Sequence, residues 1–282
     1  MLLALASALL LGTAKFGLSI YRDRLSIWIV ILISGCFALL GYLGVGLATG
    51  NLLLEQGDLG IGMLGGTLNL AGTSLLLRAY RRGAVGIATA ITASHVVIPV
   101  LASVLGGSPF TALTTAGVAC IAIGLVIFYG QAMGANAEAE HPHRRSQRAI
   151  GLALATALFW GLAIVVLNTG ARVSVSGTLL VAEVTQVVLA LLIVRAQALW
   201  PQLHSGRRAI GVLAGTGVAL ALGNSCLYLA ADHVSIGIAA ILSSLSPLVT
   251  ALLAALVFKE RLNGPERLAL VIVVAGASLM AS

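Results

Sequence analysis

The chain has 282 residues, of which 59% are hydrophobic and only 9% are charged, and its mean hydropathy is +1.07. A soluble domain would carry about 25% charged residues, so this composition excludes a soluble globular protein and indicates a chain that crosses a membrane several times. The net charge of +7 does not indicate a nucleic-acid partner, because the basic residues stand in the short segments between apolar runs.

Apolar runs of about 18 to 23 residues, long enough to cross a bilayer as helices, recur along the whole chain. Ten spans are predicted, at residues 2–20, 26–49, 58–78, 84–105, 110–132, 149–170, 177–196, 209–231, 234–258 and 264–281. The first run resembles a signal sequence but has no basic segment before it, so we expect it to remain as a span. The predicted fold class is therefore an all-α membrane protein with ten transmembrane helices.

One polar stretch near the middle of the chain, residues 133–148, is long enough to be a linker. It separates a predicted first unit, residues 1–132, from a predicted second unit, residues 149–282. Each unit contains five of the expected spans.

The 16 basic residues are distributed unevenly between the connections. Fourteen lie in odd-numbered connections, while Arg172 lies in an even-numbered one and Lys15 lies within the first span. Basic residues favour the cytoplasmic side of a membrane. We therefore expect the odd-numbered loops to be cytoplasmic and both termini to be outside, in the cell membrane.

The two halves repeat one another at a nearly constant spacing. A shift of 151 residues pairs Gly66 with Gly217 and Gly72 with Gly223, and a shift of 149 pairs Leu11-Gly12 with Trp160-Gly161. Because each copy has an odd number of spans, the second copy would cross the membrane in the opposite sense. The basic connections also exchange sides between the copies, which is typical of an inverted-repeat transporter with its substrate site between the repeats.

Two glycine pairs have the spacing that allows close helix approach, Gly46-x-x-x-Gly50 and Gly211-x-x-x-Gly215. Glycine as ordinary filler in a membrane helix explains them equally well.

The sequence resembles the drug/metabolite transporter superfamily, in the ten-helix form built from two EamA-type repeats. The resemblance is carried by Phe159-Trp160-Gly161, by the run from Gly237 through Ser246-Pro247 to Lys259-Glu260-Arg261-Leu262, and by Gly276. The first repeat departs from this pattern, because it has no acidic residue equivalent to Glu260. The resemblance implies a central cavity lined by spans one to four and six to nine, and export or exchange of small metabolites.

Polar residues inside the apolar spans are the candidates for lining such a cavity. They are Asn69, Thr73, His95, Trp160, Asn224, Ser243, Ser244 and Ser246. Each has an alternative explanation, since amides, hydroxyls and a neutral imidazole also form hydrogen bonds between helices, and tryptophan also anchors helices at the interface. Pro99 and Pro247 are candidate hinges, because proline removes a backbone donor and kinks a membrane helix.

Glu183 is the only acidic residue in the interior of a predicted span, with Gln186 one turn later on the same face. It is the candidate for proton or ion coupling, although it could instead reach the outer interface. Lys15 lies near the cytoplasmic end of the first span. Snorkelling of its side chain to the interface is the simpler explanation, and contact with a substrate carboxylate is the alternative.

The sequence contains no arrangement typical of an enzyme, a metal site or a nucleotide site, so we expect no catalysis and no cofactor. The function predicted is secondary transport of small organic metabolites, such as amino acids or drugs, by alternating access. The alternatives are a membrane scaffold or lipid-interacting subunit, and a metal-ion carrier, which would need more buried acids than Glu183 alone. The expected partners are the lipid bilayer and a small-molecule substrate, and the expected state is a monomer.

Overall fold

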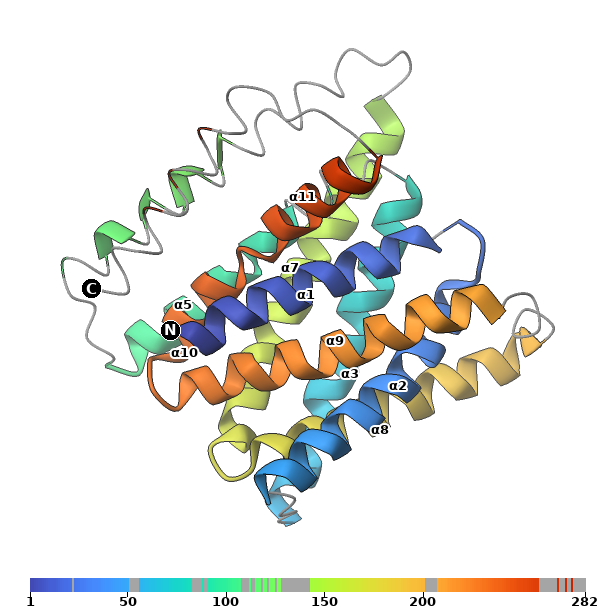
Figure 1. Cartoon of the computed structure of the whole chain (residues 1–282), viewed down its shortest axis with the longest axis horizontal. Helices are drawn as coiled ribbons and strands as arrows, with labels where there is room; N and C mark the ends of the chain where they lie inside the picture. Colours follow the sequence, from blue (N-terminus) through green and yellow to red (C-terminus); the bar gives the residue numbers. More distant parts are fainter. Residues whose placement is uncertain are drawn as a thin grey trace.

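The computed structural model is a bundle of packed helices (Figure 1). It describes residues 1–21, 23–50, 56–82, 88, 91–107, 112, 115–117, 119–120, 122–124, 126–127, 143–200, 207–258, 268, 272 and 275. No strand occurs among these residues. The prediction of an all-helical membrane protein is therefore confirmed for the described part of the chain.

Six helices in the described residues are long and apolar enough to cross a membrane. They are α1 (Leu2–Ile20), α2 (Ile27–Thr49), α3 (Gln56–Arg82), α7 (His143–Ala171), α8 (Val175–Ala196) and α9 (Arg207–Ala231). They coincide with the first, second, third, sixth, seventh and eighth predicted spans. Because α7 already begins at His143, it includes the last six residues of the stretch expected to be a linker, whose residues 133–142 lie outside the described part.

Shorter apolar helices lie within the fourth and ninth predicted spans. The fourth contains the short 3₁₀ helix η1 (Ala93–Val96) followed by α5 (Val97–Leu105), and the ninth contains α10 (Ile236–Ser243) followed by α11 (Ser246–Phe258). Most of the fifth and tenth predicted spans, and the charged turn Lys259-Glu260-Arg261, lie outside the described residues.

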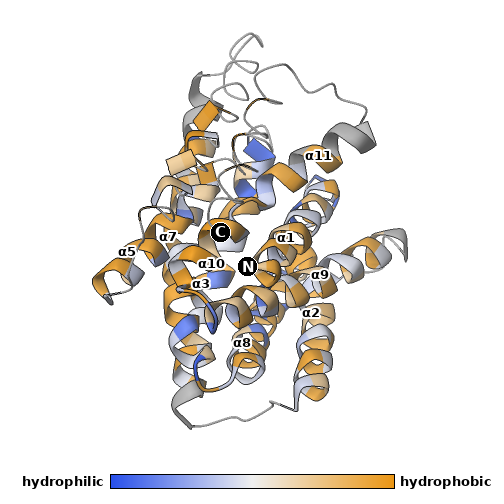
Figure 2. Cartoon of the chain, turned by 60° about the vertical axis from the view of Figure 1, so that its left-hand side comes forward, coloured by the Kyte–Doolittle hydropathy of each residue, from blue (hydrophilic) through white to orange (hydrophobic). Residues whose placement is uncertain are grey.

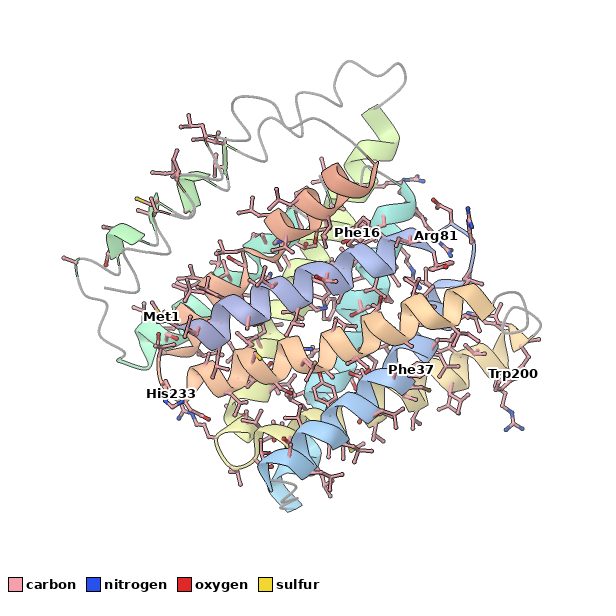
Figure 3. All side chains as sticks on the ribbon, in the orientation of Figure 1. Met1, Phe16, Phe37, Arg81, Trp200 and His233 are labelled. Atoms are coloured by element: carbon pink, nitrogen blue, oxygen red, sulfur yellow. The ribbon has the colours of Figure 1, made fainter. Side chains whose placement is uncertain are left out.

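The described helices are apolar on all faces rather than on one stripe. Figure 2 shows hydrophobic residues along most of the length of the labelled helices. Large side chains such as Leu40, Leu47 and Leu192 remain more than half exposed, which suits contact with lipid. The helix ends gather on two opposite faces: in Figure 3, Arg81 and Trp200 lie at one end of the bundle and Met1 and His233 at the other.

Polar contacts hold the helix ends in place. Ser174 and Ser235 cap the first turns of α8 and α10, because their hydroxyl oxygens accept hydrogen bonds from the backbone N–H groups of Gly177 and Ile238. At the other face, Arg81 donates a hydrogen bond to the carbonyl of Leu25. These contacts satisfy backbone groups that would otherwise lack partners at the ends of helices.

The break in the ninth span falls where the proline predicted it. Pro247 has no N–H to donate, and the helix is interrupted at Ser244 and Leu245, directly before α11. The Ser244 hydroxyl donates to the carbonyl of Ile241 at 2.6 Å, so a side chain supplies part of the hydrogen bonding at the break. In the fourth span, the 3₁₀ turn likewise ends three residues before Pro99.

Glycines allow helices of the two halves to pack closely. In the chain, α3 packs on α7 and α8, while α9 packs on α1 and α2. A Cβ atom at Gly66 would overlap the backbone of Ala182 on α8, and one at Gly217 would overlap the carbonyl oxygen of Ser34 on α2. Backbones this close can form only where a residue has no side chain.

Two further pairs of repeat-equivalent glycines also contact equivalent elements in the opposite half of the chain. Gly72 on α3 lies against Trp160 on α7, and Gly223 on α9 lies against Leu11 on α1. Similarly, Gly161 on α7 lies against the carbonyl of His95, and Gly12 on α1 lies against the carbonyl of Ser246. His95 and Ser246 are 151 residues apart, the shift that relates Gly72 to Gly223, and Gly12 and Gly161 are 149 residues apart.

The glycine motif at Gly211 and Gly215 does not bring helices together. A Cβ atom at either position would meet no atom within 4 Å, because this face of α9 is turned away from its neighbours. Gly50 is also open, and it ends α2 in the left-handed conformation with φ +65°. For these three glycines the close-approach interpretation is wrong.

We expect Gly217→Ala to destabilise the protein and Gly215→Ala, two residues away on the same helix, to leave it unchanged. The new methyl group at 217 overlaps backbone atoms of α2, which cannot move aside as a flexible side chain can. Overpacking of this kind costs about 1–3 kcal/mol. The measurement is the unfolding midpoint of the two purified variants in detergent. Equal midpoints would contradict the packing described for α2 and α9.

Candidate substrate cavity

A cavity of about 100 Å³ lies between the two halves of the bundle. Its walls come from α1, α2, α3, η1, α7, α8, α9 and α10, which correspond to predicted spans one to four and six to nine. A water molecule needs about 10–15 Å³ on this measure, so the space can hold several waters or a small solute. Its polar lining residues are Lys15, Ser34, Tyr42, Asn69, Thr73, His95, Trp160, Glu183, Gln186, Asn224, Tyr228 and Ser243.

Most of the residues singled out in the sequence lie around this one cavity. Asn69, Thr73, His95, Trp160, Glu183, Asn224 and Ser243 all line it, although they come from six separate elements. The remaining candidates do not line it. Ser244 is turned toward the Ile241 carbonyl, Ser246 lies behind Lys15, and the prolines Pro99 and Pro247 are absent from the lining.

Glu183 belongs to a chain of hydrogen-bonded side chains that joins α8 to α3. The amide Nε2 of Gln186 donates to Glu183 Oε1 at 2.9 Å, and Asn69 Nδ2 donates to Gln186 Oε1 at 3.1 Å. Glu183 is only 6% exposed, so it does not reach the outer interface as the alternative explanation required. Gly35 on α2 leaves room for it, because a Cβ atom there would lie 2.9 Å from Oε1.

Tyr42 and Asn224 form a second polar contact across the cavity. Asn224 Nδ2 on α9 donates to the hydroxyl oxygen of Tyr42 on α2 at 3.0 Å. The sequence reasoning did not select Tyr42 or Tyr228, although a tyrosine within a membrane span needs a partner for its hydroxyl. That requirement is the signal that could have identified both residues.

Lys15, Trp160 and His95 meet on the side of the cavity next to the broken ninth span. Lys15 Nζ donates to Ser246 Oγ at 2.8 Å and lies 5.2 Å from the centre of the Trp160 ring. The Trp160 and His95 rings meet edge to face, with centroids 6.1 Å apart. His95 Nδ1 lies 2.6 Å from the carbonyl oxygen of Thr92, which sets the orientation of the imidazole.

The snorkelling expected for Lys15 does not occur. Its side chain is 6% exposed and its ammonium lies inside the bundle, where it approaches Ser246 and an aromatic face. A helix that is apolar all round gives no indication of which face turns inward, so the sequence could not decide between the interface and the cavity.

No metal site is present among the described residues. No group of three or more His, Cys, Asp or Glu side chains is placed to hold a metal ion there. Cys36, Cys120 and Cys226 are free thiols. Within the described part of the chain, the cavity therefore offers hydrogen-bonding groups, one carboxyl group, two basic side chains and aromatic surface, which suits reversible binding.

We expect Asn224→Cys to react with a small water-soluble methanethiosulfonate reagent and Ser225→Cys to remain unmodified. The two positions are adjacent on α9, but Asn224 lines the cavity, whereas Ser225 is buried away from it and its hydroxyl has no partner. Both variants are made in a background that lacks the three native cysteines, and modification is measured by intact-mass spectrometry. Equal protection of both would indicate that no water reaches the cavity.

Comparisons with known proteins agree with this architecture. The model of the EamA-like transporter family matches residues 147–282. A solved structure described only as the crystal structure of a protein has a TM-score of 0.77 at 16% identity, and the alignment covers 99% of this chain and 95% of that one. No curated protein matches the sequence. The second half of the chain is therefore similar to the EamA-like transporter family, as the resemblance in the sequence indicated.

Proposed function

We propose that the protein is a secondary transporter that exports or exchanges small organic metabolites by alternating access. One observation carries the proposal: a cavity between the two halves, toward which polar side chains from eight helical elements converge. Ionisable and amide groups are expensive inside a bilayer and usually face a pathway or a partner. A transporter needs such a pathway, whereas a scaffold would be more stable with apolar residues in these positions.

The arrangement of contacts supports a movement of one half against the other. Three pairs of repeat-equivalent glycines contact equivalent elements in the opposite half, as expected if two inverted five-helix repeats are related by an approximate two-fold axis. The helix breaks next to Pro99 and Pro247 lie in equivalent spans, and α5 packs on α10. These breaks are the proposed gating points, because a broken helix can bend with little loss of hydrogen bonding.

The proposed orientation follows from the charges. Arg24, Arg81, Arg148 and Arg195 are exposed at or near helix ends in odd-numbered connections, and we assign that face of the bundle to the cytoplasm. Both termini would then lie outside the cell membrane. A C-terminal reporter fusion that is active only in the cytoplasm would contradict this orientation.

Two other functions are less well supported. A scaffold or lipid-interacting subunit gives no reason for buried Lys15 and Glu183 and half-buried Asn224 to surround a shared space. A metal-ion carrier would need several acidic ligands, and in the described residues Glu183 is the only acid that lines the cavity.

We expect the purified protein in proteoliposomes to exchange at least one solute from a panel of amino acids, nucleosides and cationic drugs. Asn69→Leu, which removes the hydrogen bond to Gln186 on the cavity wall, should lower the exchange rate by about tenfold. Thr67→Val, on the exposed face of the same helix, should leave it unchanged. Absence of exchange for the whole panel, or equal effects of the two variants, would count against the proposal.

Glu183→Gln should remove the dependence of transport on pH while preserving the protein fold. The amide is nearly the same shape and can still accept the hydrogen bond from Gln186, but it cannot bind or release a proton. The measurement is the exchange rate across a pH range for the two proteins, with Glu183→Asp as the variant that should retain the dependence. Unchanged transport and an unchanged pH profile in Glu183→Gln would eliminate proton coupling through this residue.

A further inference from the structure

The cavity contains a buried cation that has no ionic partner in the described part of the chain. Lys15 is 6% exposed, and its ammonium forms one hydrogen bond there, to the neutral hydroxyl of Ser246 at 2.8 Å. An ammonium group has three N–H donors. Buried charges in proteins are normally paired with an opposite charge, so this environment leaves the group unsatisfied.

The acid on the cavity wall does not supply that partner. Glu183 stands on α8, between α2 and α3, and its Oε1 already accepts a hydrogen bond from Gln186. Lys15 stands on α1, where its neighbours are Ser246 on α11 and the ring of Trp160 on α7. The two charges are therefore held by different helices and form no ion pair.

The neighbours of Lys15 hold its ammonium in a fixed position without neutralising it. The centroid of the Trp160 ring lies 5.2 Å from Nζ, so the ring attracts the cation, and the His95 ring meets the Trp160 ring in a T-shaped arrangement. Close packing of α1 on α11 fixes the position of the backbone, because Gly12 lies against the Ser246 carbonyl and Thr250 donates to the carbonyl of Gly12 at 2.9 Å. The cation is thus presented to the cavity from a rigid support.

We propose that Lys15 binds the carboxylate of the transported solute, and that the cavity selects solutes carrying one carboxylate on an apolar body. A carboxylate would accept the donors that Ser246 leaves unused and would supply the missing charge. The rest of the wall near α1 and α7 is apolar, with Leu11, Leu18, Ile164 and Leu167 facing the cavity. Lys15 is the only lysine or arginine among the described residues that line the cavity, so one carboxylate can be neutralised there. The identification of the bound carboxylate as a transported solute rests on the proposed transport function, whereas the binding of a carboxylate at Lys15 does not depend on it.

Trp160 provides a direct readout of binding at Lys15. In a Trp28→Phe/Trp200→Phe background it is the remaining tryptophan, so its fluorescence reports solutes that enter beside the ammonium. The full-length protein in detergent is titrated with acetate, benzoate and leucine, and with acetamide, benzamide and leucinamide as matched neutral-head controls. At least one carboxylate should change the emission at a concentration about 10- to 100-fold lower than its amide.

Substitutions at Lys15 then separate binding from structural support. Lys15→Met should abolish the difference between carboxylate and amide, whereas Lys15→Arg should retain it, because the arginine keeps the positive charge. Ser246→Ala removes the structural contact but leaves the cation, so it should preserve the discrimination. If Lys15→Met does not fold, loss of discrimination in Lys15→Arg or in Ser246→Ala still overturns the proposal.

The proposal is overturned if no carboxylate changes the emission, if carboxylates and amides act alike on the parent protein, or if Lys15→Met still discriminates between them. Loss of discrimination in Ser246→Ala would assign the effect to the Ser246 contact and would also overturn it. Carboxylate binding without exchange in proteoliposomes would leave the Lys15 assignment in place and would contradict the transport function alone.

Discussion

The interior of a bilayer offers no hydrogen-bond partners, so each polar side chain on these helices must find its partner inside the protein. That requirement explains why Lys15, Asn69, Glu183 and Asn224, from four separate helices, surround one cavity. It also explains the linkage of their contacts: Asn69 donates to Gln186, which donates to Glu183, and Asn224 donates to Tyr42. The apolar bilayer therefore accounts both for the polar side chains in the interior of the protein and for its apolar exterior.

Close approach of the two halves depends on glycines rather than on hydrophobic attraction, which is weak between helices in lipid. Gly66 and Gly217 bring α3 onto α8 and α9 onto α2, and in both cases any side chain would overlap backbone atoms. Because these contacts join the halves at the flanks, the space between the other faces of the same helices remains available for the cavity. Tight packing and an internal space are thus compatible.

The break before Pro247, the second of the two helix breaks, places irregular backbone inside the protein, whereas Ser94 in the break before Pro99 is exposed. The residues around the second break are almost completely buried, including Ser243, Ser244 and Ser246. Their three hydroxyls serve different purposes: Ser243 meets Ser7 at 2.9 Å, Ser244 satisfies the backbone, and Ser246 contacts Lys15. A membrane helix tolerates such a break where neighbouring helices supply the lost hydrogen bonds. The break and the cavity wall therefore stabilise each other.

Hydropathy and proline chemistry act locally, and for this reason the sequence by itself determined the helical class, the positions of the six long helices, the break before Pro247 and most of the polar residues around the cavity. It did not determine which face of each helix turns inward. Only the tertiary structure decided that Lys15 turns into the cavity and not to the interface. It likewise decided that Ser243 and not Ser244 lines the cavity, and that Gly217 and not Gly215 lies at a close helix contact. The physical reason is that these helices are apolar on every face, because the lipid and the neighbouring helices that surround them are both apolar. The pattern that distinguishes inside from outside in a soluble helix is therefore missing, and the packing of backbone against glycine makes the choice instead.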